Sequence, residues 1–126
     1  DNNYAIRFAS KRGQTEIVEL LLEDKRVDPS TEDNFAIQWA SYNGHTDVVK
    51  VLLQDPRVDP SAEDDEAIRF ASRNGHTEVV KFLLQDERVD PTANNNEAIR
   101  RAISNGHTEI VDLLLQDPRV SSTYRP

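Results

Sequence analysis

The residues in this chain best suited to chemistry are three histidines, His45, His76 and His107, spaced 31 residues apart. Imidazoles that converge on one point can bind a metal ion or act as a general acid and base. Each of these histidines, however, follows a glycine and precedes a threonine, so all three have the same local surroundings. An active site needs one unique combination of nucleophile, base and orienting group. The sequence therefore predicts no catalytic residues and no enzyme.

The spacing of the histidines also argues against a metal site. Equivalent positions in neighbouring stacked helices lie roughly 8–10 Å apart, whereas each zinc ligand lies about 2.0–2.1 Å from the ion. The chain has no cysteine, and its acidic segments lack the glycine-centred arrangement of a calcium loop. No glycine-rich phosphate loop is present either. We expect no metal and no cofactor, and we predict that the histidines brace loops.

The elements that carry the histidines are copies of one unit. Four glycines recur every 31 residues: Gly13, Gly44, Gly75 and Gly106. A fixed period between about 20 and 50 residues indicates a repeat array, in which copies share a core that no copy could form alone. We therefore expect a single array over residues 1–126. Its four copies span approximately residues 1–31, 32–62, 63–93 and 94–126.

Each copy contains the signals for two short antiparallel helices. In copy two, the first helix is predicted from Phe35 to Asn43 with Asn34 as its N-cap, and Gly44 ends it in a left-handed conformation. Thr46 is predicted to cap the second helix, which ends at Asp55-Pro56. The equivalent first-helix caps are Asn3, Asp65 and Asn96. The prediction is an all-α solenoid of eight helices with short connectors.

Two segments of the unit are similar to a known family pattern. Phe35–Ser41 corresponds to the Thr-Pro-Leu-His-x-Ala-Ala segment of the ankyrin repeat, and Asn74–Leu84 matches its Asn-Gly-His-x-Glu-Val-Val-Lys-Leu-Leu-Leu segment closely. The unit has 31 residues instead of about 33, and Arg88–Pro91 replaces the usual Gly-Ala-Asp-Val-Asn connector. The resemblance implies an ankyrin-type helix-turn-helix solenoid that binds proteins without catalysis. The shorter connector shifts the expected site toward the first helices, on the concave face.

Composition restricts the partners. The net charge is −8 and the isoelectric point is about 4.8, which disfavours nucleic acid, because lysine and arginine contacts to phosphate dominate that affinity. No apolar run reaches the ~20 residues needed to cross a bilayer, and no signal peptide is visible. We expect a monomer, with an intracellular location as the default. The start at Asp1 suggests a fragment.

Differences between the copies identify candidate binding residues. Copies two and three differ at nine of 31 positions, and five of the nine fall between residues 34 and 42. Aromatic side chains concentrate there, with cations nearby, which is typical of interface hot spots. The predicted partner-binding residues are Tyr4, Lys11, Phe35, Trp39, Tyr42 and Arg73. For Trp39 the alternative is a core position, because its equivalents are Phe8 and Phe70.

Charge is segregated within the unit, with basic first helices and acidic caps and connectors. The basic side chains form a stripe that can bind a partner segment bearing carboxylates or mixed charge: Arg7, Lys11, Arg12, Arg69, Arg73, Arg100 and Arg101. The alternative is that Arg7, Arg69 and Arg100 pair with carboxylates of adjacent copies. Arg101 takes the place of the first-helix aromatic in copy four, as expected for a polar terminal face.

Two other functional hypotheses stay open at this stage. The high agreement between copies also fits a consensus-like, engineered or truncated structural scaffold. Arrays of this kind also occur attached to unrelated functions, so the chain can be the ankyrin section of a larger enzyme or channel.

Overall fold

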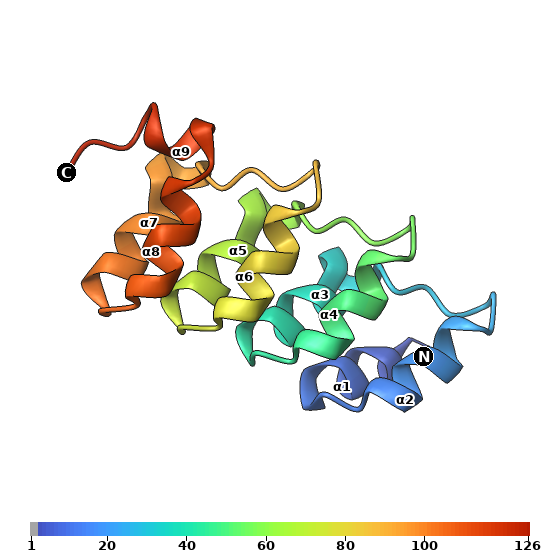
Figure 1. Cartoon of the computed structure of the whole chain (residues 1–126). Coiled ribbons are helices and arrows are strands. Elements are labelled where there is room, and N and C mark those ends of the chain that lie inside the picture. The colour runs from blue at the N-terminus through green and yellow to red at the C-terminus, as the bar shows by residue number, and fades with distance from the viewer. Residues whose placement is uncertain (1–2) are drawn as a thin grey trace.

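The structure is a computed structural model that describes residues 3–126. This part of the chain forms four antiparallel helix pairs and one short final helix (Figure 1). The first helices of the pairs are α1 (Tyr4–Arg12), α3 (Thr31–Tyr42), α5 (Ala62–Arg73) and α7 (Ala93–Ser104). The second helices are α2 (Thr15–Leu22), α4 (Thr46–Leu53), α6 (Thr77–Leu84) and α8 (Thr108–Leu115), and α9 (Pro118–Ser121) follows. The helix-turn-helix solenoid is confirmed, with α9 as an addition to the eight predicted helices.

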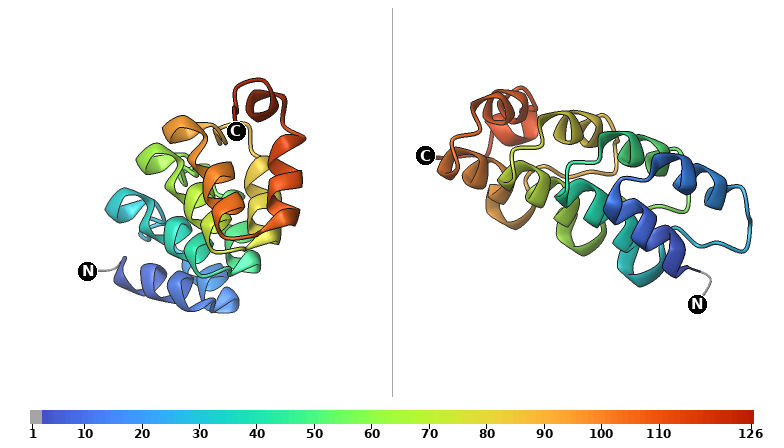
Figure 2. Two further views of the ribbon diagram at one scale, coloured as in Figure 1. Left: turned by 90° about the vertical axis from the view of Figure 1, so that its left-hand side faces the viewer. Right: turned by 90° about the horizontal axis from the view of Figure 1, so that it is seen from below.

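The helices form two layers, one of first helices and one of second helices (Figure 2). Neighbouring first helices pack against one another more extensively than neighbouring second helices do. Closer packing in one layer is what a stack curved toward its first helices requires. None of the described helices is long and apolar enough to span a membrane.

The core lies between the two layers and continues from copy to copy. The same isoleucine of each first helix is almost fully buried, at Ile6, Ile37, Ile68 and Ile99. Second helices face them with residues such as Val49 and Leu52. Burying one such side chain stabilises the fold by about 1.5–3 kcal/mol. First helices contact the first helices of neighbouring copies more extensively than they contact their own second helices. The stability of each copy therefore depends on its neighbours.

A glycine turn joins the two helices of each pair, as predicted. Gly44 has a φ of +75°, and its N–H donates to the carbonyl of Ser41 at 3.2 Å, which ends α3. A Cβ on Gly44 would lie 2.5 Å from Nδ1 of His76 in the next copy. The position therefore needs glycine for two independent reasons, the left-handed backbone and the close approach of the next histidine.

Asn3 is the N-cap residue of α1 as predicted, but none of the predicted first-helix caps makes a side-chain cap bond, and in copies two to four the start of the helix differs. Residues 32–34, 63–65 and 94–96 all have positive φ and form a left-handed turn before the right-handed helix begins. Asn34 therefore does not cap α3, and its Oδ1 instead accepts from the N–H of Asp59 at 2.8 Å. Thr46 is likewise the first residue of α4 and makes no cap bond, with His45 in the preceding position.

The side chains predicted as caps instead connect the two ends of one copy. Asn3 accepts from the N–H of Asp28 at 2.7 Å, and Asp65 accepts from the N–H of Asp90 at 2.8 Å. In copy four the equivalent Asn96 donates from Nδ2 to Oγ1 of Thr123. These bonds attach the connector at the end of a copy to the start of its first helix.

A long polar side chain stabilises each left-handed turn. Left-handed residues other than glycine cost about 1–2 kcal/mol each, and their carbonyls lack the usual helical partners. Gln38 donates from Nε2 to the carbonyl of Asp33 at 2.6 Å. Arg69 and Arg100, at the equivalent positions, donate from Nε and Nη2 to the two carbonyls that lie five and six residues before them.

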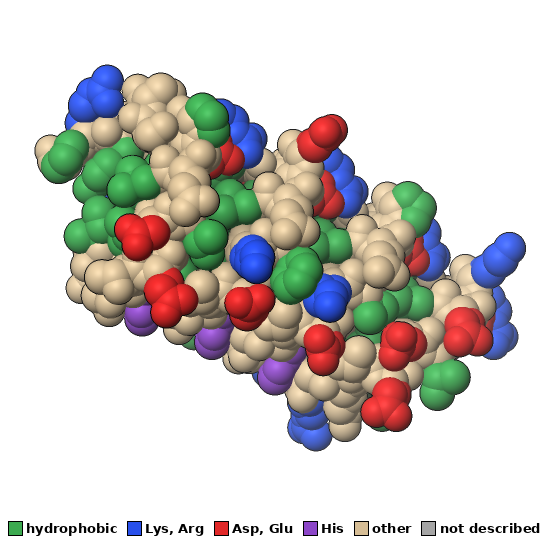
Figure 3. Space-filling model, in the orientation of Figure 1, with side chains coloured by type: hydrophobic (Ala, Val, Ile, Leu, Met, Phe, Trp, Pro, Cys, Tyr) green, Lys and Arg blue, Asp and Glu red, His purple; other side chains and the backbone are tan. Residues whose placement is uncertain are grey.

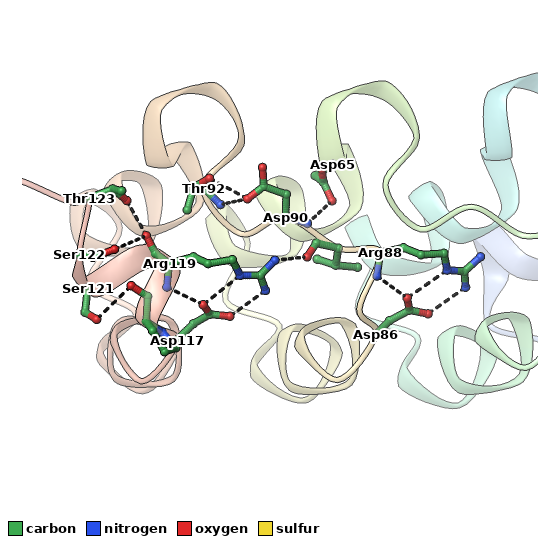
Figure 4. Close-up of polar contacts among 12 residues, drawn as sticks. Asp65, Asp86, Arg88, Asp90, Thr92, Asp117, Arg119, Ser121, Ser122 and Thr123 are labelled. Carbon is green, nitrogen blue, oxygen red and sulfur yellow. Dashed lines mark hydrogen bonds and ion pairs between the residues drawn. The ribbon is translucent and has the colours of Figure 1, made fainter.

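An aspartate–arginine pair holds each connector, and the sequence analysis did not identify it. Arg88 donates from Nε and Nη2 to the two carboxylate oxygens of Asp86, at 3.0 and 2.8 Å (Figure 4). Its third donor, Nη1, reaches the carbonyl of Val58 in the preceding copy at 2.6 Å. These hydrogen bonds hold the pKa of Asp86 below its ordinary value. Arg57 and Arg119 make the same contacts, so connectors are linked from copy to copy.

The outer side of copy four differs from the internal stacking surfaces. Ser10, Ser41 and Ser72 are fully buried at one position of the first helices, whereas the equivalent Ile103 is 47% exposed. Isoleucine is too large for the space that these serines occupy. Arg101 is also exposed. Copy four therefore ends in a surface that does not reproduce the internal contacts.

Candidate functional site

A line of aromatic rings runs across the first helices of copies one to three. We call these residues the aromatic strip: Tyr4, Phe8, Phe35, Trp39, Tyr42 and Phe70. Within α1, the rings of Tyr4 and Phe8 stack at 4.3 Å between centres. Trp39 in α3 lies 5.7 Å from Phe35 and 5.1 Å from Tyr42. Tyr42 then meets Phe70 of α5 edge-on at 5.5 Å, so the strip crosses from one copy to the next.

Helix geometry places the rings on one side of α3. Phe35, Trp39 and Tyr42 are separated by four and three residues, which puts them on neighbouring positions of the helix surface. The opposite side carries buried residues such as Ile37 and Ala40. The three rings are each half-buried. They therefore pack against one another and still present apolar area to solvent.

Two cations of α1 lie between the aromatic rings of α1 and α3. The Lys11 ammonium lies 5.9 Å from the centre of the Phe8 ring and 5.0 Å from that of Trp39. The Arg7 guanidinium lies 5.8 Å from Tyr4 and 6.0 Å from Phe35. Contacts of this kind contribute about 0.5–1 kcal/mol at exposed sites. They join the two helices across the surface of the strip.

The structure brings five of the six predicted binding residues together. Four of them belong to the aromatic strip, and the fifth, Lys11, contacts one of its rings: the four are Tyr4, Phe35, Trp39 and Tyr42. The core interpretation of Trp39 is wrong, because its side chain is half-buried and not enclosed.

Three residues in or beside the aromatic strip were not predicted from the sequence as binding residues. Phe8 and Phe70 lie at positions equivalent to Trp39, and Arg7 lies between two rings. The signal that could have found them was their place in the 31-residue register. Arg73, the sixth predicted residue, is exposed one copy further along on α5.

In copy three only Phe70 continues the strip, and in copy four Arg101 takes the equivalent position. Arg69 forms an ion pair with Glu97 of α7 at 3.0 Å, which confirms the predicted pairing between adjacent copies. The same prediction is wrong for Arg100, whose side chain donates to the carbonyls of Asn94 and Asn95 in its own helix. The aromatic strip therefore ends at Phe70, and the first-helix surface beyond it carries charged side chains.

The histidines brace the turns, as predicted. Nε2 of His76 lies 2.8 Å from the carbonyl of Tyr42, and Asn74 donates to the same carbonyl from Nδ2 at 3.1 Å. His45 and His107 make the equivalent contacts. All three lie in a row along one edge of the array (Figure 3). Across residues 3–126, no group of histidine, aspartate and glutamate side chains is arranged to hold a metal ion.

Asp65 stands out among the titratable groups. Its side chain is 6% exposed at the start of α5. Burial raises its pKa from 3.8 to about 6, and the nearby carboxylates of Asp90 and Asp59 act in the same direction. The N–H of Asp90 and the charge of Arg69 oppose the shift only in part. Asp65 is buried below the surface of the first helices. Its charge therefore affects the stability of the fold and not the binding of a partner.

The second helices offer a smaller feature on the opposite side of the molecule. Lys50, Phe82 and Asp86 are among the residues that line a hollow of about 240 Å³ between α4 and α6. The Lys50 ammonium lies 5.0 Å from the centre of the Phe82 ring. Acidic and basic side chains are interspersed over this face (Figure 3). Among residues 3–126, the ring contacts all lie on the first helices, so the second helices carry no comparable line of rings.

Comparison with known proteins agrees with this architecture. A family model described as ankyrin repeats (three copies) matches residues 1–64 and, in a second alignment, residues 55–123. The two matches overlap and together contain every helix and the whole aromatic strip. No curated protein matches the chain in sequence.

Proposed function

Since the chain belongs to the ankyrin repeat family, whose members generally act as protein-interaction modules, we propose that it binds a protein partner through its first-helix surface. The module acts as a monomer and without catalysis. Tyr4, Phe35 and Tyr42 contact the partner at the centre of the site. Lys11 and Arg73 lie at its rim, and Trp39 supports the central rings.

The observation that carries this proposal is the aromatic strip, whose rings touch within α1 and from Phe35 to Phe70, with Arg7 and Lys11 between the two groups. Tyr4 is 53% exposed, and Phe35 and Tyr42 retain part of their area in solvent. Partly exposed rings in contact with each other offer a rigid apolar surface with a low entropic cost of binding, and aromatic and arginine side chains are enriched among interface hot spots. A partner that covers the strip would remove this area from water.

Tyr42 is the most informative residue of the strip. Its equivalents in the other copies are Lys11, Arg73 and Ser104, so the scaffold itself does not need an aromatic ring there. Its ring nevertheless joins Trp39 to Phe70 across the boundary between two copies. An aromatic ring that the fold does not require, placed at the centre of an exposed cluster, supports a role in binding.

The test begins by capturing a partner with the wild-type protein and measuring its Kd by titration calorimetry. Tyr42→Ala should then weaken binding by roughly 2 kcal/mol, or about 30-fold. Combining Phe35→Ala with Tyr42→Ala should abolish capture. The fold should persist in Tyr42→Ala, because the equivalent residues are polar, although the loss of the contacts with Trp39 and Phe70 should lower the melting temperature somewhat.

The matched control is Lys50→Ala combined with Lys81→Ala on the second helices, which should leave Kd unchanged. If the second-helix variants weaken binding while the Phe35→Ala and Tyr42→Ala variants bind normally, the proposed site is refuted. If no captured protein depends on either surface, the scaffold hypothesis is favoured in its place.

A further inference from the structure

The repeat register brings two arginines together at the end of the aromatic strip. At the first interface, the last turn of α1 places Lys11 against Trp39 in the middle of α3. At the second interface, Tyr42 lies against Phe70 in the same way. Arg73 and Arg101 occupy these two positions at the third interface, between α5 and α7. The register therefore places these two residues at facing positions of neighbouring first helices.

Neither of these arginines has an ionic partner within residues 3–126. Glu97 lies one turn before Arg101, but its carboxylate is bound by Arg69 at 3.0 Å. Glu66 lies seven residues before Arg73, which is two helical turns or about 10 Å away. Both arginines are exposed. Two adjacent positive charges thus face solvent without a carboxylate between them.

We propose that Arg73 and Arg101 bind a carboxylate side chain, aspartate or glutamate, of the protein partner, an inference that rests on the proposed function. Guanidinium groups bind carboxylates through two parallel N–H···O bonds. A carboxylate between the two arginines also relieves their mutual repulsion, so binding removes an unfavourable interaction as well as adding a favourable one.

The position of the pair defines the partner more closely. Neighbouring first helices are roughly 8–10 Å apart, so the carboxylate lies about one helix spacing beyond Tyr42. A segment in the polyproline II conformation rises about 3.1 Å per residue and has three residues per turn, so side chains three residues apart lie on the same side of it. The partner segment therefore carries an apolar side chain on the aromatic strip and an acidic side chain about three residues away.

The acidic character of the remaining surface favours this placement. The left-handed turns at the start of the first helices carry exposed carboxylates at Glu32, Asp33, Glu63 and Asp64. With a net charge of −8, most of the molecule repels an acidic segment. Arg73 and Arg101 place positive charge at the end of the strip, which favours one position and direction of the segment.

The test is a selection of displayed random dodecapeptides on the wild-type protein. Selected peptides should combine an aromatic or large aliphatic residue with aspartate or glutamate about three residues away. Arg73→Glu combined with Arg101→Glu should weaken their binding at least tenfold. Lys50→Glu combined with Lys81→Glu makes the same change of net charge on the other layer and should have little effect.

The two proposals fail in different ways. Peptides that need Phe35 and Tyr42 but carry no acidic residue, and bind the double arginine variant normally, would overturn the carboxylate site alone. Peptides insensitive to Phe35→Ala and Tyr42→Ala would overturn the proposed function itself. If the glutamate variant melts at a lower temperature than wild type, Arg73→Gln with Arg101→Gln replaces it, and the same tenfold loss is expected.

Discussion

Replacing Asp65 by asparagine should stabilise the protein. The other copies carry Asn3, Asn34 and Asn96 at this position, and both Asn34 and Asp65 accept a backbone N–H of their own connector at 2.8 Å. Asparagine at residue 65 can accept the same bond through Oδ1. The substitution therefore keeps the geometry and removes a buried negative charge.

The expected gain follows from the pKa of Asp65. Burial raises this pKa from 3.8 to about 6, and one pKa unit corresponds to 1.36 kcal/mol. At pH 7 the carboxyl is ionised in both states, so the folded state bears an unfavourable contribution on the order of 3 kcal/mol from this group. Asp65→Asn should increase the free energy of unfolding by about this amount.

The pH dependence provides a second readout. Between pH 4 and 6 the folded state binds more protons at Asp65 than the unfolded state does, so this group makes stability rise as pH falls through that range. The variant should lack this rise, and the difference between the two proteins should vanish near pH 4. Further acidification destabilises both, because arginine contacts lower the pKa values of Asp55, Asp86 and Asp117.

The assay is urea denaturation followed by circular dichroism at several pH values. Asn34→Asp is the matched control, because it introduces a carboxylate at the equivalent site and should destabilise the protein at pH 7 by a similar amount. A variant no more stable than wild type at pH 7, or a difference that persists unchanged at pH 4, would refute the reasoning.

Three further predictions concern the contacts between copies, each measured as a change in unfolding free energy. Gly44→Val should lower the free energy of unfolding by more than about 1 kcal/mol, and by more than Gly106→Val does. Both glycines have positive φ, but only at Gly44 does a histidine lie close to the added Cβ. Equal losses would show that backbone strain alone matters. Ser72→Ala should stabilise by about 1 kcal/mol, because the buried hydroxyl has no hydrogen-bond partner, whereas Ser72→Ile should cost about 1–3 kcal/mol by overpacking. An alanine variant less stable than wild type would indicate a partner for the hydroxyl. His76→Ala should cost about 1 kcal/mol, since Tyr42 then loses one of two donors to its carbonyl; no loss would mean that the Asn74 donor suffices.

The sequence by itself determined the repeat architecture. A 31-residue period is a property of the chain that needs no tertiary information, and the glycine turns, helix pairs and shared core follow from local rules of helix formation. The same reasoning identified the bracing histidines and most of the aromatic strip. These features could be predicted because each depends on residue type and on spacing within one copy.

Only the tertiary structure decided what the polar side chains bind. Asn34 looks like a helix cap, yet its partner is a backbone N–H that lies 25 residues later. Arg88 similarly bonds a carbonyl 30 residues earlier. Such partners belong to another segment, and local rules cannot distinguish them from nearer ones.

The candidate site shows the same division. Spacing places Phe35, Trp39 and Tyr42 on one side of a helix, but the exposure of Trp39 and the contact between Tyr42 and Phe70 depend on how neighbouring copies stack. Arg73 and Arg101 are separated by 28 residues and become neighbours only through that stacking. Side-chain burial and charge proximity are properties of packed pairs of helices, and for that reason a single repeat does not contain them.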